Sequence, residues 1–159
     1  PDFVSQWFPI SQKPEETFVA GLSMGGYGAL KWLFTAPEKF RGGASFSGAL
    51  DVVDLWENDP SRNEHFSRIF GSLKEISASE NDLNWLVKTQ QKQAQHLKIY
   101  QSCGTEDFLL SVNRKFQKNW QDHFVDYQYV EKPGNHNWTF WNQELQIILK
   151  KFAAILPEK

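Results

Sequence analysis

The sequence feature that most limits how this chain can fold is the pentapeptide G-L-S-M-G at residues 21–25. The residues around it predict a short buried strand over 17–22 and a helix over 24–36. A serine at the tip of a sharp strand-to-helix turn is held in strained backbone geometry, with its hydroxyl exposed. We therefore expect Ser23 to act as a nucleophile.

Two further expectations follow from this turn. Its tight geometry needs small neighbours, and Gly21, Gly25 and Gly26 supply the room. The backbone N–H of Met24, at the start of the helix, is the expected donor to a developing oxyanion. A second donor normally comes from a loop after an earlier strand. Because no strand is predicted before 17–22, we expect that donor to lie outside this chain.

Alternating strands and helices are predicted along the rest of the chain. Further strands are expected at 42–48, 97–103 and 125–130, further helices at 1–8, 108–124 and 138–156, and short helical stretches at 63–70 and 79–92. This alternation predicts an α/β fold with four mostly parallel strands and helices on the faces of the sheet. We expect a single domain over 1–159, in which residues 50–96 form a helical, cap-like insert over the site.

The composition excludes several classes of function. The formal net charge of −2, with mixed signs, argues against a nucleic-acid partner. No apolar run approaches the ~18 residues of a membrane-spanning helix, so no membrane partner is expected. Cys103 is the single cysteine, which excludes an intramolecular disulfide and favours a cytoplasmic location.

A serine hydroxyl needs a base to take its proton and an acid to orient that base. Where the serine lies on such a turn, the acid and then a histidine follow it in the chain, on loops at the carboxyl ends of strands. His136 directly follows the last predicted strand and is the expected base. The other histidines lie in the insert, at its exit and near a helix end: His65, His96 and His123.

Asp107 is the expected acid, because it follows the strand at 97–103 in the segment G-T-E-D-F. An aspartate at a helix start is also a good N-cap, so capping is an alternative role. Glu106 is a local rival for the acid, and Asp51, after the strand at 42–48, is a second.

Three segments of this sequence together resemble one known family. They are G-L-S-M-G-G-Y-G-A at 21–29, G-T-E-D-F at 104–108 and G-N-H-N-W-T-F-W at 134–141. In this order they resemble the esterase D-like family of α/β-hydrolases, with the closest similarity to the small bacterial tributyrin esterases. The resemblance implies a serine carboxylesterase that hydrolyses short-chain acyl esters through an acyl-enzyme.

The resemblance assigns the nucleophile, acid and base to Ser23, Asp107 and His136, with no metal and no cofactor. The family also includes S-formylglutathione hydrolases and mycolyltransferases, so a thioester substrate or acyl transfer stays open. A catalytically inert hydrolase fragment, or an interaction module, is the alternative from another class.

The resemblance covers the C-terminal half of the family's fold. The strand at 17–22 would then have an unpaired parallel edge. We expect the N-terminal half of the same fold, or another chain as in a homo-oligomer, to cover that edge. The only other partner expected is a small acyl ester.

Aromatic side chains outside the three catalytic positions have two expected roles. Phe66, Phe70 and Trp85 of the insert are apolar enough to line a small acyl pocket, although anchoring the insert to the sheet is an equal alternative. Trp138 and Trp141 are expected to pack the loop of the base rather than touch substrate, with a simple core role as an equal alternative.

Overall fold

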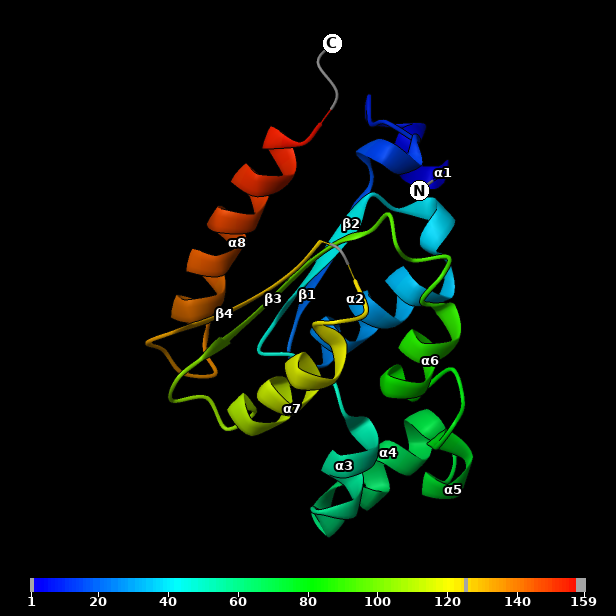
Figure 1. Ribbon diagram of the computed structural model, residues 1–159, viewed down its shortest axis with the longest axis vertical. Helices are drawn as coiled ribbons and strands as arrows, with labels where there is room; N and C mark the ends of the chain where they lie inside the picture. The colour runs from blue at the N-terminus through cyan, green and yellow to red at the C-terminus, as the bar shows by residue number, and fades with distance from the viewer. Residues whose placement is uncertain (1, 125, 157–159) are drawn as a thin grey trace.

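A computed structural model describes residues 2–124 and 126–156, and a single parallel sheet forms its centre (Figure 1). The strands are β1 (Phe18–Leu22), β2 (Gly42–Phe46), β3 (Lys98–Gly104) and β4 (Tyr127–Lys132), in that spatial order. All three neighbouring pairs are parallel, which confirms the predicted α/β sheet. The carboxyl ends of the four strands therefore meet at one edge, where the candidate site lies.

Helices cover both faces of the sheet (Figure 1). One face carries α2 (Met24–Thr35), α6 (Leu83–Gln90) and α7 (Leu110–Trp120), and the other carries α8 (Trp138–Ala154). Alternate side chains of β3 point to opposite faces, so Ile99 packs with the first group and Tyr100 with α8. None of the helices in the described ranges is both long and apolar enough to cross a membrane.

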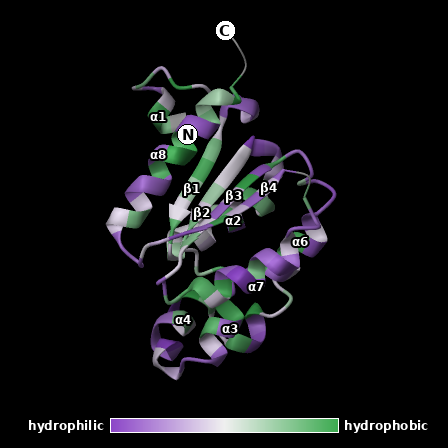
Figure 2. Ribbon diagram, turned by 60° about the vertical axis from the view of Figure 1, so that its left-hand side comes forward, coloured by the Kyte–Doolittle hydropathy of each residue, from purple (hydrophilic) through white to green (hydrophobic). Residues whose placement is uncertain are grey.

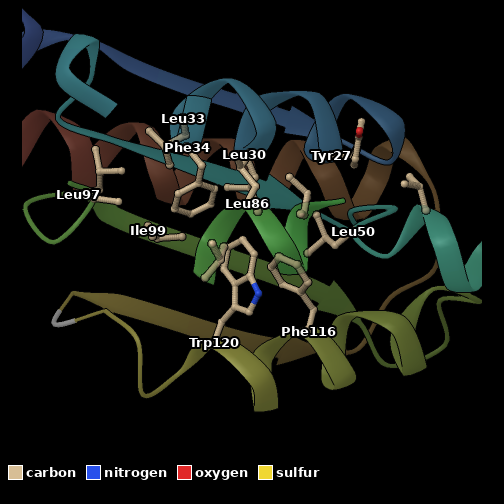
Figure 3. Packing of buried hydrophobic residues seen from close by; sticks show 14 of the residues in the cluster. Tyr27, Leu30, Leu33, Phe34, Leu50, Leu86, Leu97, Ile99, Phe116 and Trp120 are labelled. Atoms are coloured by element: carbon tan, nitrogen blue, oxygen red, sulfur yellow. The ribbon is translucent and has the colours of Figure 1, made fainter. Parts of the chain in front are cut away.

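The larger hydrophobic core lies between the sheet and α2, α6 and α7 (Figure 3). Phe34 of α2 meets Trp120 of α7 edge-on, with ring centroids 4.9 Å apart. Phe116 lies beside Trp120, and all three side chains are almost completely buried. Burial of each such side chain stabilises the fold by about 1.5–3 kcal/mol. This core fixes α2, and with it the turn that precedes α2.

The insert contains more helices than the sequence pattern predicts. Its helices are α3 (Val52–Glu57), α4 (Asn63–Phe70) and α5 (Leu73–Ile76), and it ends with α6. The helices expected at 63–70 and 79–92 are present as α4 and α6. The helices α3 and α5 were missed because each is too short to show helical periodicity.

The first helix is shorter than expected. The sequence predicts a helix at 1–8, whereas α1 spans Asp2–Ser5. Pro1 of the helix expected at 1–8 and Val125 of the strand expected at 125–130 lie outside the described residues.

Strand β1 lies at an edge of the sheet, as expected. Within the described residues it pairs with β2 alone, and its side chains are less buried than those of β2. Phe18 stacks on Phe152 of α8 at 4.1 Å, the exposed Leu145 and Leu149 follow the face of Phe152 along the helix, and the exposed Leu156 lies just after its end. Figure 2 shows mainly hydrophobic colouring along β1 and a mixture of hydrophobic and hydrophilic colouring along α8. An open strand edge thus adjoins an exposed apolar helix face.

Candidate active site

Ser23 occupies the tip of the turn between β1 and α2, as the sequence predicts. Its φ of 53° and ψ of −124° are strained for a residue with a side chain. Its N–H donates to the carbonyl oxygen of Phe46 at 3.0 Å, and its carbonyl oxygen accepts from the N–H of Ala49 at 3.1 Å. The end of β2 and the loop after it therefore hold the strained serine in place.

The glycines around Ser23 do not all serve the same purpose. A Cβ at Gly21 would lie 2.1 Å from the carbonyl oxygen of Gly25, and a Cβ at Gly26 would lie 2.5 Å from Ser45 Oγ. A Cβ at Gly25 would meet no atom of the described residues within 4 Å. The expectation that all three glycines supply room is corrected for Gly25, because its carbonyl, not its Cα hydrogens, crowds the turn.

A continuous hydrogen-bonded chain joins the three residues expected to be nucleophile, base and acid. Ser23 Oγ lies 2.9 Å from His136 Nε2, and His136 Nδ1 lies 2.9 Å from Asp107 Oδ2. The Asp107 side chain is completely buried, and that of His136 is 18% exposed. When Nδ1–H donates to the carboxylate, Nε2 is left to accept the serine proton. The arrangement can therefore generate a serine alkoxide.

Asp107 also satisfies the backbone at the start of the following helix. Its Oδ1 accepts the N–H of Leu109 at 2.8 Å, and its own N–H donates to the carbonyl oxygen of Gly104 at 3.2 Å. The capping alternative is wrong, because the N-cap of α7 is Leu109, which has no side-chain cap, and Asp107 accepts the N–H of that residue from the loop before the helix. The backbone bonds fix the carboxylate in the position that meets His136.

The two rival acids have other partners. Glu106 Oε2 accepts the N–H of Gly134 at 2.8 Å, and its Oε1 accepts from the hydroxyl of Thr105 at 2.7 Å. Asp51 caps α3 by accepting the N–H of Asp54 at 3.0 Å. Neither rival is the carboxylate that the structure brings to His136. Glu106 instead ties the loop of the acid to the loop of the base.

The remaining histidines lie away from Ser23. His96 Nε2 is 3.1 Å from the carbonyl oxygen of Pro37, and His65 is exposed on α4. The carbonyl oxygen of His123 accepts from the side-chain amide of Gln95 at 2.7 Å. His136 is the histidine that the structure brings to the serine.

A buried carboxylate that sequence reasoning missed fixes the far side of the His136 loop. Glu144 of α8 is fully buried and accepts from Tyr100 Oη at 2.8 Å and from Lys132 Nζ at 2.7 Å. Burial, followed by the Glu144 carboxylate, raises the pKa of Tyr100 above its usual range. Lys132 ends β4 and Glu144 lies within α8, so this network ties the strand before the His136 loop to the helix after it.

Glu106→Ala is expected to loosen the hydrogen bond between His136 and Asp107. The change removes the acceptor for the Gly134 N–H, two residues before His136. Losing a hydrogen bond to a carboxylate should make opening of this loop about tenfold more frequent. The measurement is exchange of the low-field His136 Nδ1 proton with solvent, followed by NMR.

Glu75→Ala is the matched control for that variant. Glu75 is also exposed, and its Oε2 accepts a backbone N–H at 2.8 Å and a hydroxyl at 2.7 Å, both from Ser72 in the insert. This variant should leave the His136 proton unchanged. Equal exchange rates in the two variants would show that Glu106 does not hold the loop.

Two aromatic rings contact His136 directly, and they differ in burial. Trp141 meets the imidazole edge-on at 4.8 Å and is 8% exposed, whereas Phe108 lies 4.5 Å from the imidazole and is 66% exposed. Trp138 stands edge-on to Trp141 at 5.6 Å but is largely exposed. Trp141 therefore packs against the loop of the base, whereas the rings of Trp138 and Phe108 are largely exposed to solvent.

The insert residues expected near the acyl group lie in the core of the insert. Phe66 meets Phe70 edge-on at 5.6 Å, and Phe70 meets Tyr27 of α2 edge-on at 5.8 Å. Trp85 is half-buried against the same cluster. These contacts anchor the insert one turn after Ser23. Lining of an acyl pocket by these residues stays a prediction.

The start of α2 presents a backbone donor beside Ser23. The N–H groups of Gly26 and Tyr27 donate to the Ser23 carbonyl oxygen at 3.0 and 3.2 Å. In the part of the chain that the structure describes, the N–H of Met24 has no acceptor. A free N–H at a helix N-terminus suits a developing oxyanion.

Among residues 2–124 and 126–156, no group of three His, Cys, Asp or Glu is placed to hold a metal ion.

The α/β-hydrolases are defined by a strained serine between a parallel strand and a helix. This serine forms a hydrogen bond to a histidine, which in turn contacts an aspartate, and both follow later strands. The fold and the site thus place this protein in that class. The chain belongs to the Esterase family, whose model ("Putative esterase") matches residues 1–152.

Relatives of known name agree with this membership. An acetyl esterase of Caldicellulosiruptor saccharolyticus is 37% identical over 149 residues, covering 89% of this chain and 56% of the relative. An S-formylglutathione hydrolase of Staphylococcus aureus superposes with a TM-score of 0.80 at 30% identity, covering 98% of this chain and 60% of that one. The corresponding hydrolase of Agrobacterium tumefaciens has a TM-score of 0.78 at 19% identity and 99% and 55% coverage, and shows the shared fold. This chain thus spans little more than half of each relative.

Proposed function

We propose that this chain carries the nucleophile, base and acid of a serine carboxylesterase that hydrolyses short-chain acyl esters. The observation that carries the proposal is the hydrogen-bonded chain from Ser23 through His136 to Asp107, built on a strained turn. The fit of three residues from three separate loops into one chain of contacts is the geometry that acyl transfer needs.

The proposed reaction has two halves. Ser23 Oγ attacks the ester carbonyl carbon while His136 Nε2 takes its proton, and the N–H of Met24 binds the oxyanion. The bond from the carbonyl carbon to the alcohol oxygen breaks as Nε2 returns the proton to that oxygen. Water then attacks the acyl-enzyme by the same route, releasing the acid and restoring Ser23. Asp107 keeps the imidazole oriented throughout.

The similarity to the relatives supports a small acyl group and is consistent with two kinds of leaving group, an alcohol or a thiol. The similarity to an acetyl esterase favours short acyl esters. The similarity to an S-formylglutathione hydrolase supports a second candidate, hydrolysis of a thioester at the same three residues. Transfer of the acyl group to an alcohol would differ only in the acceptor.

We also propose that the N-terminal half of the same fold covers the open edge of β1 and supplies the second oxyanion donor. The unpaired edge, the exposed apolar face of α8 and the partial coverage of the relatives support this partner. A second copy of this chain, forming a homo-oligomer, is the alternative occupant.

Fluorophosphonate labelling tests the proposed site. We expect modification at Ser23, read by peptide mass spectrometry, and none in Ser23→Ala. Adding the N-terminal part of the acetyl esterase relative should speed labelling by about 10²–10³-fold, the worth of one oxyanion donor. Intact masses and native mass spectrometry would report a dimer if a second copy covers the edge.

A sample in which Ser23 stays unlabelled both alone and with the N-terminal part would contradict the esterase proposal. The chain would then be the inert fragment or interaction module that the sequence leaves open. If the chain alone were labelled as fast as it is with the N-terminal part, the proposal that this part supplies the second donor would be contradicted.

A cytoplasmic location stays a prediction that rests on the single cysteine. Cys103 is free and buried at the end of β3. Burial, followed by the nearby Asp107 carboxylate, raises the pKa of its thiol to about 12. The thiol is therefore protonated at neutral pH and fits a structural role.

A further inference from the structure

Phe108 displays a large apolar ring beside the reacting imidazole instead of packing it away. Its ring centroid lies 4.5 Å from that of His136, with the ring planes 49° apart, and the residue is 66% exposed. The backbone on both sides is fixed, because Asp107 is buried and Leu109, 2% exposed, donates its N–H to the Asp107 carboxylate. The exposure of Phe108 is therefore a feature of the site and not the fraying of a loose loop.

Trp141 and Phe108 both contact His136, but they differ in burial. Trp141 makes a ring contact of similar length with His136, but it is buried in the smaller core between α8 and the sheet. Trp141 therefore supports the imidazole from the side of the core. An exposed aromatic ring that is not needed for packing leaves apolar surface for a ligand.

The chemistry at His136 decides which part of the ester this surface meets. During acylation the proton taken from Ser23 Oγ passes from Nε2 to the alcohol oxygen as the carbon–oxygen bond breaks. The alcohol oxygen then lies within hydrogen-bond distance of Nε2, so the rest of the alcohol lies beside the imidazole. The acyl carbonyl instead points its oxygen toward the N–H of Met24. The exposed ring of Phe108 lies against the same imidazole and is therefore available to the alcohol portion.

Charges around the two loops disfavour an anionic leaving group. Arg114, Lys115 and Lys132 lie on the elements that flank these loops, and each is already paired with a carboxylate: Glu131 at 2.6 Å, Asp54 at 2.8 Å and Glu144 at 2.7 Å respectively. Glu106 adds a further carboxylate next to Asp107. A leaving group with its own carboxylates, such as glutathione, would meet paired cations and a negative neighbour.

We propose that Phe108 binds the alcohol portion of the substrate and selects esters of uncharged aromatic alcohols. The proposal rests on the proposed function, in which Ser23 and His136 act as nucleophile and base. Stacking of one aromatic pair should favour such an ester by about three- to tenfold over an aliphatic one.

The test compares kcat/KM for benzyl acetate and ethyl acetate, whose leaving alcohols have similar acidity. Phe108→Ala removes the ring, and Phe108→Leu keeps an apolar side chain without an aromatic face. Trp32→Ala is the matched control, because Trp32 is also a half-exposed ring in edge-on contact with another ring, Phe40, at 5.4 Å. Ethyl acetate and ethyl butyrate report acyl preference separately.

The wild-type chain and Trp32→Ala should prefer the benzyl ester by about three- to tenfold, and both Phe108 variants should lose that preference. The acetate-to-butyrate ratio should stay the same in all of them. An unchanged benzyl preference in the Phe108 variants, or a changed acyl preference, would overturn this inference alone. All assays contain the N-terminal part of the acetyl esterase relative. Wild-type turnover in its presence no greater than that of Ser23→Ala would overturn the proposed function and this inference with it.

Discussion

Asp107→Asn is expected to slow reaction at Ser23 by about 10³–10⁴-fold without unfolding the chain. The asparagine amide nitrogen can donate where the carboxylate accepts, and this favours the imidazole tautomer that carries its proton on Nε2. Such an imidazole cannot take the proton of Ser23 Oγ. The rate of fluorophosphonate labelling measures the effect directly.

Asp51→Asn is the control for this prediction. Asp51 is also a buried carboxylate that accepts a backbone N–H at a helix start, and an asparagine caps a helix almost as well. We expect its labelling rate to stay within about threefold of wild type. A similar loss in Asp51→Asn, or none in Asp107→Asn, would show that the acid has been assigned to the wrong residue.

The predictable part of the site lies in segments where a few consecutive residues determine the local structure. Ser23 is marked by the glycines of its turn and by the strand and helix on either side. Asp107 and His136 are marked by their positions just after predicted strands. Because parallel strands bring their carboxyl ends to one edge, strand order alone brings these loops together.

The contacts that support the site depend on residues far apart in sequence, which no local pattern shows. Glu144 bonds to Tyr100 across 44 positions, and its only sequence signal is its place between Trp141 and Ile148 on the apolar face of a helix. The role of Glu106 in holding Gly134 across 28 positions is equally hidden, since the sequence presents Glu106 only as a rival acid.

The contacts that assemble the site come from β2, β3 and β4, on the side of β1 away from its open edge. Every hydrogen bond that holds the Ser23 backbone from outside its own turn comes from β2 or the loop after it, through Phe46 and Ala49. Asp107 and His136 follow β3 and β4, farther from the open edge of β1. The contacts that join the nucleophile, base and acid therefore need no strand beside the open edge of β1. The second oxyanion donor is the contribution that we expect from the proposed N-terminal half.

Gly21→Ala should destabilise the chain by about 3 kcal/mol, the upper end of typical overpacking costs. The new Cβ would lie 2.1 Å from the carbonyl oxygen of Gly25, a backbone atom that cannot move without shifting the first turn of α2. A loss of this size should lower the midpoint of thermal unfolding by about 10 °C in a chain of this length. Circular dichroism of the helices measures it.

Gly25→Ala, in the same pentapeptide, is expected to leave the thermal stability unchanged or to raise it. Its Cβ would meet no described atom within 4 Å, and alanine is favoured over glycine inside a helix by about 0.5–1 kcal/mol. The midpoint should therefore stay level or rise by about 1–3 °C. Equal destabilisation by the two variants would mean that the turn needs both glycines for backbone conformation. The close approach at Gly21 would then not be the cause.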